Sequence, residues 1–357
     1  MTLIVSPPPR WSAVMAELPT SSELVLFGGK TEANLYNGNI AYGGLLNDTW
    51  VFNSSSQWVS ISTGFTTSGA TTTLTGPPPR SDAAMSFDGT YVTMMGGANG
   101  TASLSDTWSY NTSGGWIQQP ETENIGTATY NATYGAWSGP VGTPPSYNVF
   151  SVPTYLKSAC MAYRSGTGAV LFGGEASYQR NYSLDTWVWT AGSPGSWAIQ
   201  SPAAWPVART NAAMASNGGT TVMFGGKNFA GGLSDTNIWN GTVWSTVATG
   251  QTPGVSSPSA RYGASMVYHA ATSQYILFGG VTTNGYAFDL WAFSTGTNLW
   301  TNITTGTPGL GAPLGRAFAA MAYNSATTST ILFGGLNSTR GLGDTWSFSG
   351  GLWSQLG

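Results

Sequence analysis

The chain has 357 residues, of which 13% are aromatic, 49 are glycine and only 7% are charged, and its formal net charge is −3. So weak a charge excludes the basic surface that nucleic acid requires and the polybasic patch that binds anionic lipid. Because no apolar run is long enough to span a bilayer, we also expect no direct membrane insertion by this chain.

The first ten residues lack the charged and apolar regions of a signal peptide. Their Pro-Pro-Pro-Arg ending matches the segment that ends at Arg80, so they have the character of a linker that leads into a repeat. We expect any export signal to lie outside this chain, with room for further protein beyond it.

From Arg10 onward one pattern occurs six times: Arg, a strand with Ala-Met, a turn, an apolar strand ending in Gly-Gly, a loop, Asp-x-Trp, a turn and a second Trp. The Asp-x-Trp motif at Asp235 is a variant in which Trp239 comes two residues late. The units cover approximately 10–62, 80–119, 157–201, 209–249, 261–304 and 316–356, with an insertion at 120–156. Their diglycines begin at Gly28, Gly96, Gly173, Gly225, Gly279 and Gly334. Their acidic positions are Asp48, Asp106, Asp185, Asp235, Asp289 and Asp344.

Each unit contains four short β-prone runs separated by turn residues, which predicts an antiparallel meander of strands a to d. In the last unit the predicted strands are Ala319–Tyr323, Ser329–Phe333, Thr345–Phe348 and Leu352–Gln355. The diglycine ends strand b where the backbone turns sharply, and the tryptophans are large apolar groups suited to packing between units.

The linked diglycine, Asp-x-Trp and second aromatic residue resemble the kelch family over about residues 10 to 356. The resemblance implies an all-β, six-bladed β-propeller, a single domain whose four-stranded antiparallel blades surround a central channel. Because the last unit contains its own strand d, we expect closure of the ring by apolar contact between blades 6 and 1, without exchange of a terminal strand.

In such blades the b–c and d–a connections share one end of the disc. The three long segments 30–46, 61–79 and 120–156 are all connections of these kinds, so we expect them at that end. The third is rich in aromatic residues that could stack on sugar rings or dock a partner, or could pack on the propeller as a lid. The candidates are Tyr130, Tyr134, Trp137 and Tyr147.

A cationic residue precedes strand a in every unit. Arginines stand five residues before the repeat methionine at Arg10, Arg80, Arg209, Arg261 and Arg316, and Lys157 stands four before Met161. The family resemblance implies a place near the channel mouth, where kelch relatives hold acidic ligands with some of their arginines. Two hypotheses stay open: these cations bind an anion or carboxylate, or they pair with the six repeat aspartates.

Residues for catalysis are scarce. Cys160 is the only cysteine and lies in a core-like strand, and His269, the only histidine, is expected to be partly exposed on the end opposite the long loops. One histidine excludes the two-histidine site of the copper-radical oxidases that share kelch-type propellers. Acidic residues predicted near the long loops leave a glycan-active enzyme as an alternative, namely Glu32, Asp82, Glu121, Glu123 and Glu175. Since their spacing singles out no pair, we expect no catalytic residue, cofactor or metal.

Nine Asn-x-Ser/Thr sequons are N-glycosylation candidates: Asn47, Asn53, Asn99, Asn111, Asn131, Asn181, Asn240, Asn302 and Asn337. A surface rich in Ser, Thr, Asn and Gly but poor in Lys and Glu suits an extracellular or cell-surface glycoprotein. We therefore expect a non-enzymatic module that binds a protein or a glycan through the long-loop end. The alternatives are a self-associating subunit of a surface layer or filament, and the carbohydrate-active enzyme.

Overall fold

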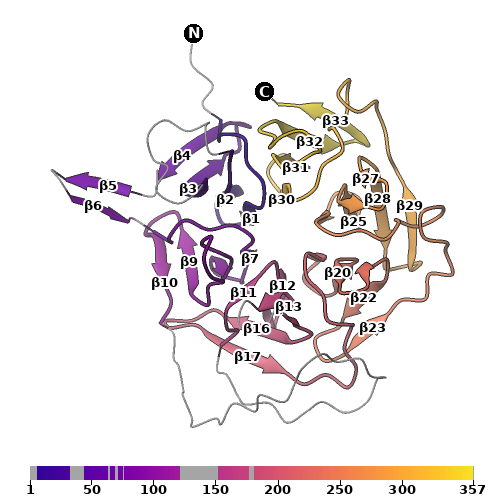
Figure 1. Cartoon of the computed structure of the whole chain (residues 1–357), viewed down its shortest axis with the longest axis horizontal. Coiled ribbons are helices and arrows are strands. Elements are labelled where there is room, and N and C mark those ends of the chain that lie inside the picture. The colour runs from indigo at the N-terminus through magenta and orange to yellow at the C-terminus, as the bar shows by residue number, and fades with distance from the viewer. Residues whose placement is uncertain are drawn as a thin grey trace.

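The computed structural model of the chain describes residues 6–32, 44–62, 65–68, 71–74, 76–120, 152–176 and 181–356. Over these residues the protein is all-β, and six four-stranded antiparallel sheets stand around a central axis as the blades of a propeller (Figure 1). The predicted fold class is thereby confirmed. In the described part of the chain no helix is both long and apolar enough to cross a membrane.

The blades follow one another in chain order, and each is a simple meander. The strands a, which line the channel, are β1 (Val14–Leu18), β7 (Ala84–Phe87), β12 (Cys160–Arg164), β18 (Ala213–Ser216), β24 (Ser265–His269) and β30 (Ala320–Asn324). The strands b are β2 (Glu23–Lys30), β8 (Val92–Met95), β13 (Gly168–Phe172), β19 (Thr221–Phe224), β25 (Gln274–Phe278) and β31 (Ser329–Phe333).

The outer half of each blade consists of strands c and d. The strands c are β3 (Leu45–Phe52), β9 (Thr107–Asn111), β16 (Thr186–Thr190), β22 (Thr236–Trp239), β28 (Leu290–Ser294) and β32 (Thr345–Ser349). The outermost strands d are β4 (Trp58–Ser62), β10 (Gly115–Gln118), β17 (Ser196–Gln200), β23 (Trp244–Thr246), β29 (Leu299–Asn302) and β33 (Leu352–Gln355). In blade 6, strands b and d have the predicted bounds, strand a begins and ends one residue later than predicted, and strand c ends one residue later.

Among the described residues, four short additional sheets lie in the connections between the blade strands. Three of them belong to b–c loops: β14 (Glu175–Ala176) with β15 (Asn181–Tyr182) and β11 (Leu156–Lys157), β20 (Lys227–Asn228) with β21 (Gly231–Gly232), and β26 (Val281–Thr282) with β27 (Gly285–Tyr286). The fourth is a hairpin of β5 (Phe65–Ser68) and β6 (Thr71–Leu74) in the connection from blade 1 to blade 2. This hairpin extends outward from the disc (Figure 1).

The core is divided among the spaces between neighbouring blades. Because side chains alternate along a strand, β2 places Leu24 and Leu26 against blade 6 and Val25 and Phe27 against blade 2. Each blade thus supplies one apolar face to each neighbour. This arrangement explains why a single blade could not bury its own apolar residues and why the repeats must close into a ring.

The second tryptophan of a blade also bonds to the preceding blade. Trp58 packs edge-on against Phe333 at 5.1 Å between ring centroids, and its indole N–H donates to Thr345 Oγ1 at 2.9 Å. Four other tryptophan–threonine pairs repeat this bond: Trp116 with Thr49, Trp197 with Thr107, Trp244 with Thr186, and Trp300 with Thr236. The middle residue of the Asp-Thr-Trp motif is therefore an acceptor for the next blade, a role the sequence pattern did not reveal.

Blades 6 and 1 close the ring without exchanging a strand, as predicted. A shared apolar cluster joins them, and the backbone adds hydrogen bonds from Arg10 N to Leu342 O and from Gly335 N to Arg10 O, at 2.9 and 2.8 Å. Gly334 adopts φ +65°, and a Cβ there would lie 2.5 Å from the Arg10 carbonyl oxygen. The diglycine is required where the two chain segments approach so closely.

Candidate functional site

The blade topology creates two different ends of the disc. The b–c and d–a connections lie at one end, which we call the loop face, and the short a–b and c–d turns lie at the other, the turn face. The connections 30–46, 61–79 and 120–156 therefore enter and leave the blades on the loop face. Most of the third segment lies outside the described residues, including Tyr130, Tyr134, Trp137, Tyr147, Glu121, Glu123 and Asn131.

A closed ring of six peptide hydrogen bonds surrounds the channel just before strands a begin. In each blade one N–H donates to the carbonyl oxygen of the equivalent residue in the preceding blade, at 2.7–3.1 Å. The ring residues are Ser12, Asp82, Ser158, Asn211, Gly263 and Phe318, all with φ between 54° and 66°. Five residues other than glycine hold this uncommon conformation because the ring fixes their amides.

Below this ring, the channel holds a cavity of about 190 Å³. The ring residues and the following residues of strands a line it, down to the six repeat methionines: Met15, Met85, Met161, Met214, Met266 and Met321. Polar groups thus lie at the mouth, whereas the wall below is made mostly of alanine and methionine side chains.

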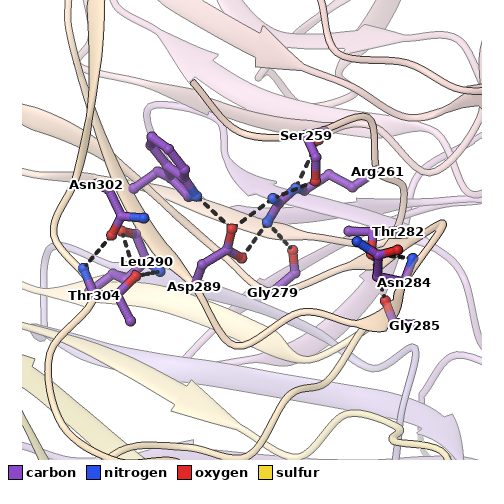
Figure 2. A network of polar contacts seen from close by, with 11 residues as sticks. Ser259, Arg261, Gly279, Thr282, Asn284, Gly285, Asp289, Leu290, Asn302 and Thr304 are labelled. Atoms are coloured by element: carbon purple, nitrogen blue, oxygen red, sulfur yellow. Dashed lines mark hydrogen bonds and ion pairs between the residues drawn. The ribbon is translucent and has the colours of Figure 1, made fainter. Parts of the chain in front are cut away.

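The five repeat arginines are buried ties between blades. Arg261 is 2% exposed, and its guanidinium contacts the Asp289 carboxylate through two bonds of 2.6 and 2.8 Å and the Gly279 carbonyl at 3.0 Å (Figure 2). Its own backbone bonds to blade 4 through Leu233 and Gly226. Arg10, Arg80, Arg209 and Arg316 form the same bidentate pairs with Asp48, Asp106, Asp235 and Asp344.

These are the pairs of the second hypothesis for the cations, in which they bond to the repeat aspartates. Four of the five guanidinium N–H donors of Arg10 already bond within the protein. Burial would raise the pKa of Asp289, but hydrogen bonds and charge from Arg261 and a bond from the Trp291 indole outweigh it and hold the pKa below its ordinary value. The pKa values of Asp106, Asp235 and Asp344 are lowered in the same way.

Blade 3 departs from this pattern, and the predicted alignment of Lys157 with the arginines is wrong. The buried Leu156 takes the arginine position, since its carbonyl accepts from Gly97 N at 2.9 Å as that of Arg80 does from Gly29 N. The ammonium of Lys157 instead lies 3.3 Å from Glu175 Oε1.

Asp185 is consequently the one repeat aspartate without a guanidinium partner among the described residues. Its contact there is with Ser183, and burial raises its pKa. The cations and acids therefore form five equivalent pairs, not the six that equal spacing predicted.

All three lysines of the chain lie around the channel mouth. Lys30 Nζ contacts Asp82 Oδ2 at 2.9 Å, and Lys227 Nζ lies 4.8 Å from the ring centroid of Tyr262, which is the range of a cation–π contact. Tyr262 in turn lies 6.3 Å from Phe318 between centroids. We call Lys30, Asp82, Asn211, Lys227, Tyr262 and Phe318 the channel-mouth site.

The carboxylate of this site is stabilised in its charged form. Burial would raise the pKa of Asp82, but the Lys30 charge and hydrogen bonds from Ser12 and Ser81 outweigh it and lower the pKa. The site therefore presents fixed charges, an amide and half-buried aromatic faces. Such a set can bind hydroxyl groups and stack on planar or sugar rings, whereas Asp82 is poorly suited to donating a proton.

Exposed apolar side chains among the connections gather on the loop face. They are Tyr155, Val207, Phe229, Val255, Phe288, Leu310 and Leu314. The most exposed are Leu310 at 85%, Val255 at 77% and Phe229 at 75%, and Phe229 stacks on Tyr182 at 4.6 Å. None of the described turns of the opposite face bears an exposed large apolar residue. Leu299 and Leu352, which begin β29 and β33 directly after c–d turns, are also exposed, so the two ends of the disc differ in their connecting segments.

The sequons differ in their surroundings. Asn47 is only 5% exposed, so it cannot take a glycan in the folded chain. Asn240 and Asn302 are exposed and Asn53, Asn99, Asn111 and Asn337 are half-buried, and each of these six accepts a loop N–H with Oδ1. The side chain of Asn181 lies outside the described part of the chain.

The expectation for His269 is wrong. It is 2% exposed, its Nδ1 lies 3.0 Å from Thr330 Oγ1, its ring packs on Tyr323, and burial lowers its pKa. Cys160 is buried as predicted, and burial raises its pKa to about 12. The described residues contain no group of His, Cys, Asp and Glu that could hold a metal ion.

The fold defines the class of this protein, a six-bladed β-propeller. A scan against models of known protein families finds no match, and a search of curated proteins finds no significantly similar sequence.

Proposed function

We propose that this chain is a kelch-type propeller that works outside the cell as a non-enzymatic binding module, with its protein or glycan ligand on the loop face. The motif order, from the diglycine through Asp-x-Trp to the second tryptophan, supports kelch ancestry. The observation that carries the binding function is the one-sided distribution of exposed apolar connection residues, because such groups mark interaction surfaces.

The channel-mouth site adds polar specificity to that surface. The Tyr262–Phe318 faces, the Asn211 amide and the fixed Lys30–Asp82 pair share the channel mouth. This combination of stacking and hydrogen bonding suits a sugar or the side chains of a partner. An extracellular place is supported by the six sequons whose described asparagines lie in accessible loops or strand ends, with Nδ2, the atom that a glycan would modify, not engaged by the described protein.

The enzymatic alternative has weaker support. Three of its candidate carboxylates are described, and all are engaged: Asp82 with Lys30, Glu175 with Lys157, and Glu32 Oε1 with the Gly341 N–H at 3.0 Å. No pair of them is poised as acid and base. A glycosidase test with Glu175→Gln would still decide: turnover by the native chain that this substitution removes would replace our proposal.

Binding is tested with the full chain on an array of neutral and acidic oligosaccharides and against purified cell-surface proteins of its source. The test variant combines Phe229→Ser, Val255→Ser and Leu310→Ser on the loop face. The matched control is Leu299→Ser, which removes a side chain 42% exposed on an outer strand. We expect a bound probe to be lost with the triple variant and kept with the control. Equal loss in both, or retention in the triple variant, would overturn the choice of face.

A further inference from the structure

The outer edges of the blades lack the usual protection against pairing with another chain. None of the six strands d contains a charged residue or a proline, although proteins commonly use such residues to block sheet edges. Five of these strands contain an exposed large apolar residue, namely Val59, Ile117, Ile199, Leu299 and Leu352. The rim of the disc is therefore a set of short, uncharged β-edges.

The edge of β29 is already bonded by a side chain of the same chain, unlike the edge of β33. In β29 the Gln251 side chain bonds both backbone groups of Trp300, accepting from its N–H at 2.7 Å and donating to its carbonyl at 2.8 Å. These two groups consequently face away from β28. The equivalent residue of β33 is Trp353, since Phe348↔Trp353 corresponds to Phe293↔Trp300 in register. No described side chain bonds the backbone of Trp353. The Gly351 carbonyl, just before β33, accepts from Thr305 Oγ1 at 2.9 Å, so the open part of this edge is β33 itself.

The hairpin β5–β6 is the matching element. It forms a two-stranded sheet of its own, it leaves the disc between blades 1 and 2 (Figure 1), and its two strands have four residues each, as β33 does. Two strands alone are marginally stable in water and gain from a third. No residue of the hairpin or of β33 is charged, so pairing would desolvate no ion.

We propose that the hairpin β5–β6 of one copy adds to the open edge of β33 in a second copy, extending blade 6 of that copy by β-augmentation. The donor and the acceptor are different surfaces at separate places on the rim (Figure 1). Each added copy therefore leaves one hairpin and one edge unused, and the contact propagates head to tail into an open linear assembly. The inference stands apart from ligand binding on the loop face.

The test compares the full chain with two variants by sedimentation velocity and negative-stain microscopy. In one, residues 65–74 are replaced by a short Gly-Ser linker, which removes the donor; in the other, Leu352→Lys places a charge on the acceptor edge. Leu299→Lys is the matched control, because it makes the same change at the equivalent position of the edge that Gln251 caps. We expect linear oligomers from the native chain and from Leu299→Lys, and monomers from each of the other two.

Mixing provides the decisive result. The hairpin-deleted chain keeps its acceptor and Leu352→Lys keeps its donor, so an equal mixture should form dimers and nothing larger. Added salt should not weaken the assembly, since no ion pair holds it. A native chain that stays monomeric at its highest soluble concentration, oligomers that survive hairpin deletion, or a mixture that remains monomeric would each overturn the inference. Circular dichroism establishes that every variant is folded.

Discussion

Replacing Arg316 by Met would remove the side-chain bonds that hold this residue to blade 6, while keeping much of the side-chain volume and the backbone bonds to blade 5. The guanidinium is fully buried and makes four hydrogen bonds, to Leu314 O, Gly334 O and both carboxylate oxygens of Asp344. The substitution leaves Asp344 with the Trp346 indole as its remaining side-chain donor. Breaking a buried pair in this way costs about 3–5 kcal/mol, because an uncompensated charge stays behind.

The loss of folding stability caused by Arg316→Met should fall at the lower end of that range. The Asp344 side chain is 22% exposed, so water can partly replace the lost donors. A double variant, Arg316→Met with Asp344→Asn, removes the stranded charge and keeps an acceptor for Trp346. It should therefore be more stable than the single variant by about 1–2 kcal/mol.

Urea unfolding followed by tryptophan fluorescence measures these differences, and acid provides an independent check. Burial would raise the pKa of Asp344, but the Arg316 hydrogen bonds and charge lower it below the ordinary 3.8. The pair's contribution is thus fully present above pH 3.8 and is lost as the pH falls through the folded-state pKa. A single variant within about 1 kcal/mol of the native chain, or a difference that does not shrink in acid, would refute our account of the arginines as structural ties.

Three further substitutions test the missing pair of blade 3, a tryptophan–threonine bond and a diglycine turn. Leu156→Arg should give blade 3 its missing pair and convert the raised pKa of Asp185 into a lowered one, which titration of that carboxyl by NMR would reveal; an unchanged pKa would contradict the equivalence of Leu156 with the arginines. Thr236→Val should cost about 1 kcal/mol of folding stability by removing the acceptor of the Trp300 indole N–H. Leu290→Val, at the one equivalent position without a threonine, should lose only packing. Loss of a tryptophan hydrogen bond in both variants alike would be inconsistent with the structure. Gly335→Ala should cost about 1–3 kcal/mol, since φ is +99° and a Cβ would lie 2.9 Å from Ala317 O, and a neutral effect on the unfolding midpoint would contradict the tight turn.

The repeat could be predicted because each of its parts is a local signal. Diglycines, Asp-x-Trp motifs and second tryptophans recur in one order, and alternating apolar residues specify strands whatever surrounds them. The same locality explains the errors. The charge of Lys157 suggests the arginine position, although the count from Met161 favours Leu156. The burial of His269 and Asn47 has no local signal, because it depends on neighbouring blades and connections.

The residues themselves determined the number of blades, the strand order and the end of the disc at which long connections emerge, because hydrophobic period and turn chemistry act within a few residues of one another. Only the tertiary structure decided what the charged groups do and which residues line the channel. Ser12, Asp82 and Phe318 have no side-chain property in common, yet their amides occupy equivalent places in one hydrogen-bonded ring. That ring exists between blades, and each arginine–aspartate pair joins residues 26 to 38 positions apart within one blade. Such contacts form only once the blades fold and close around an axis.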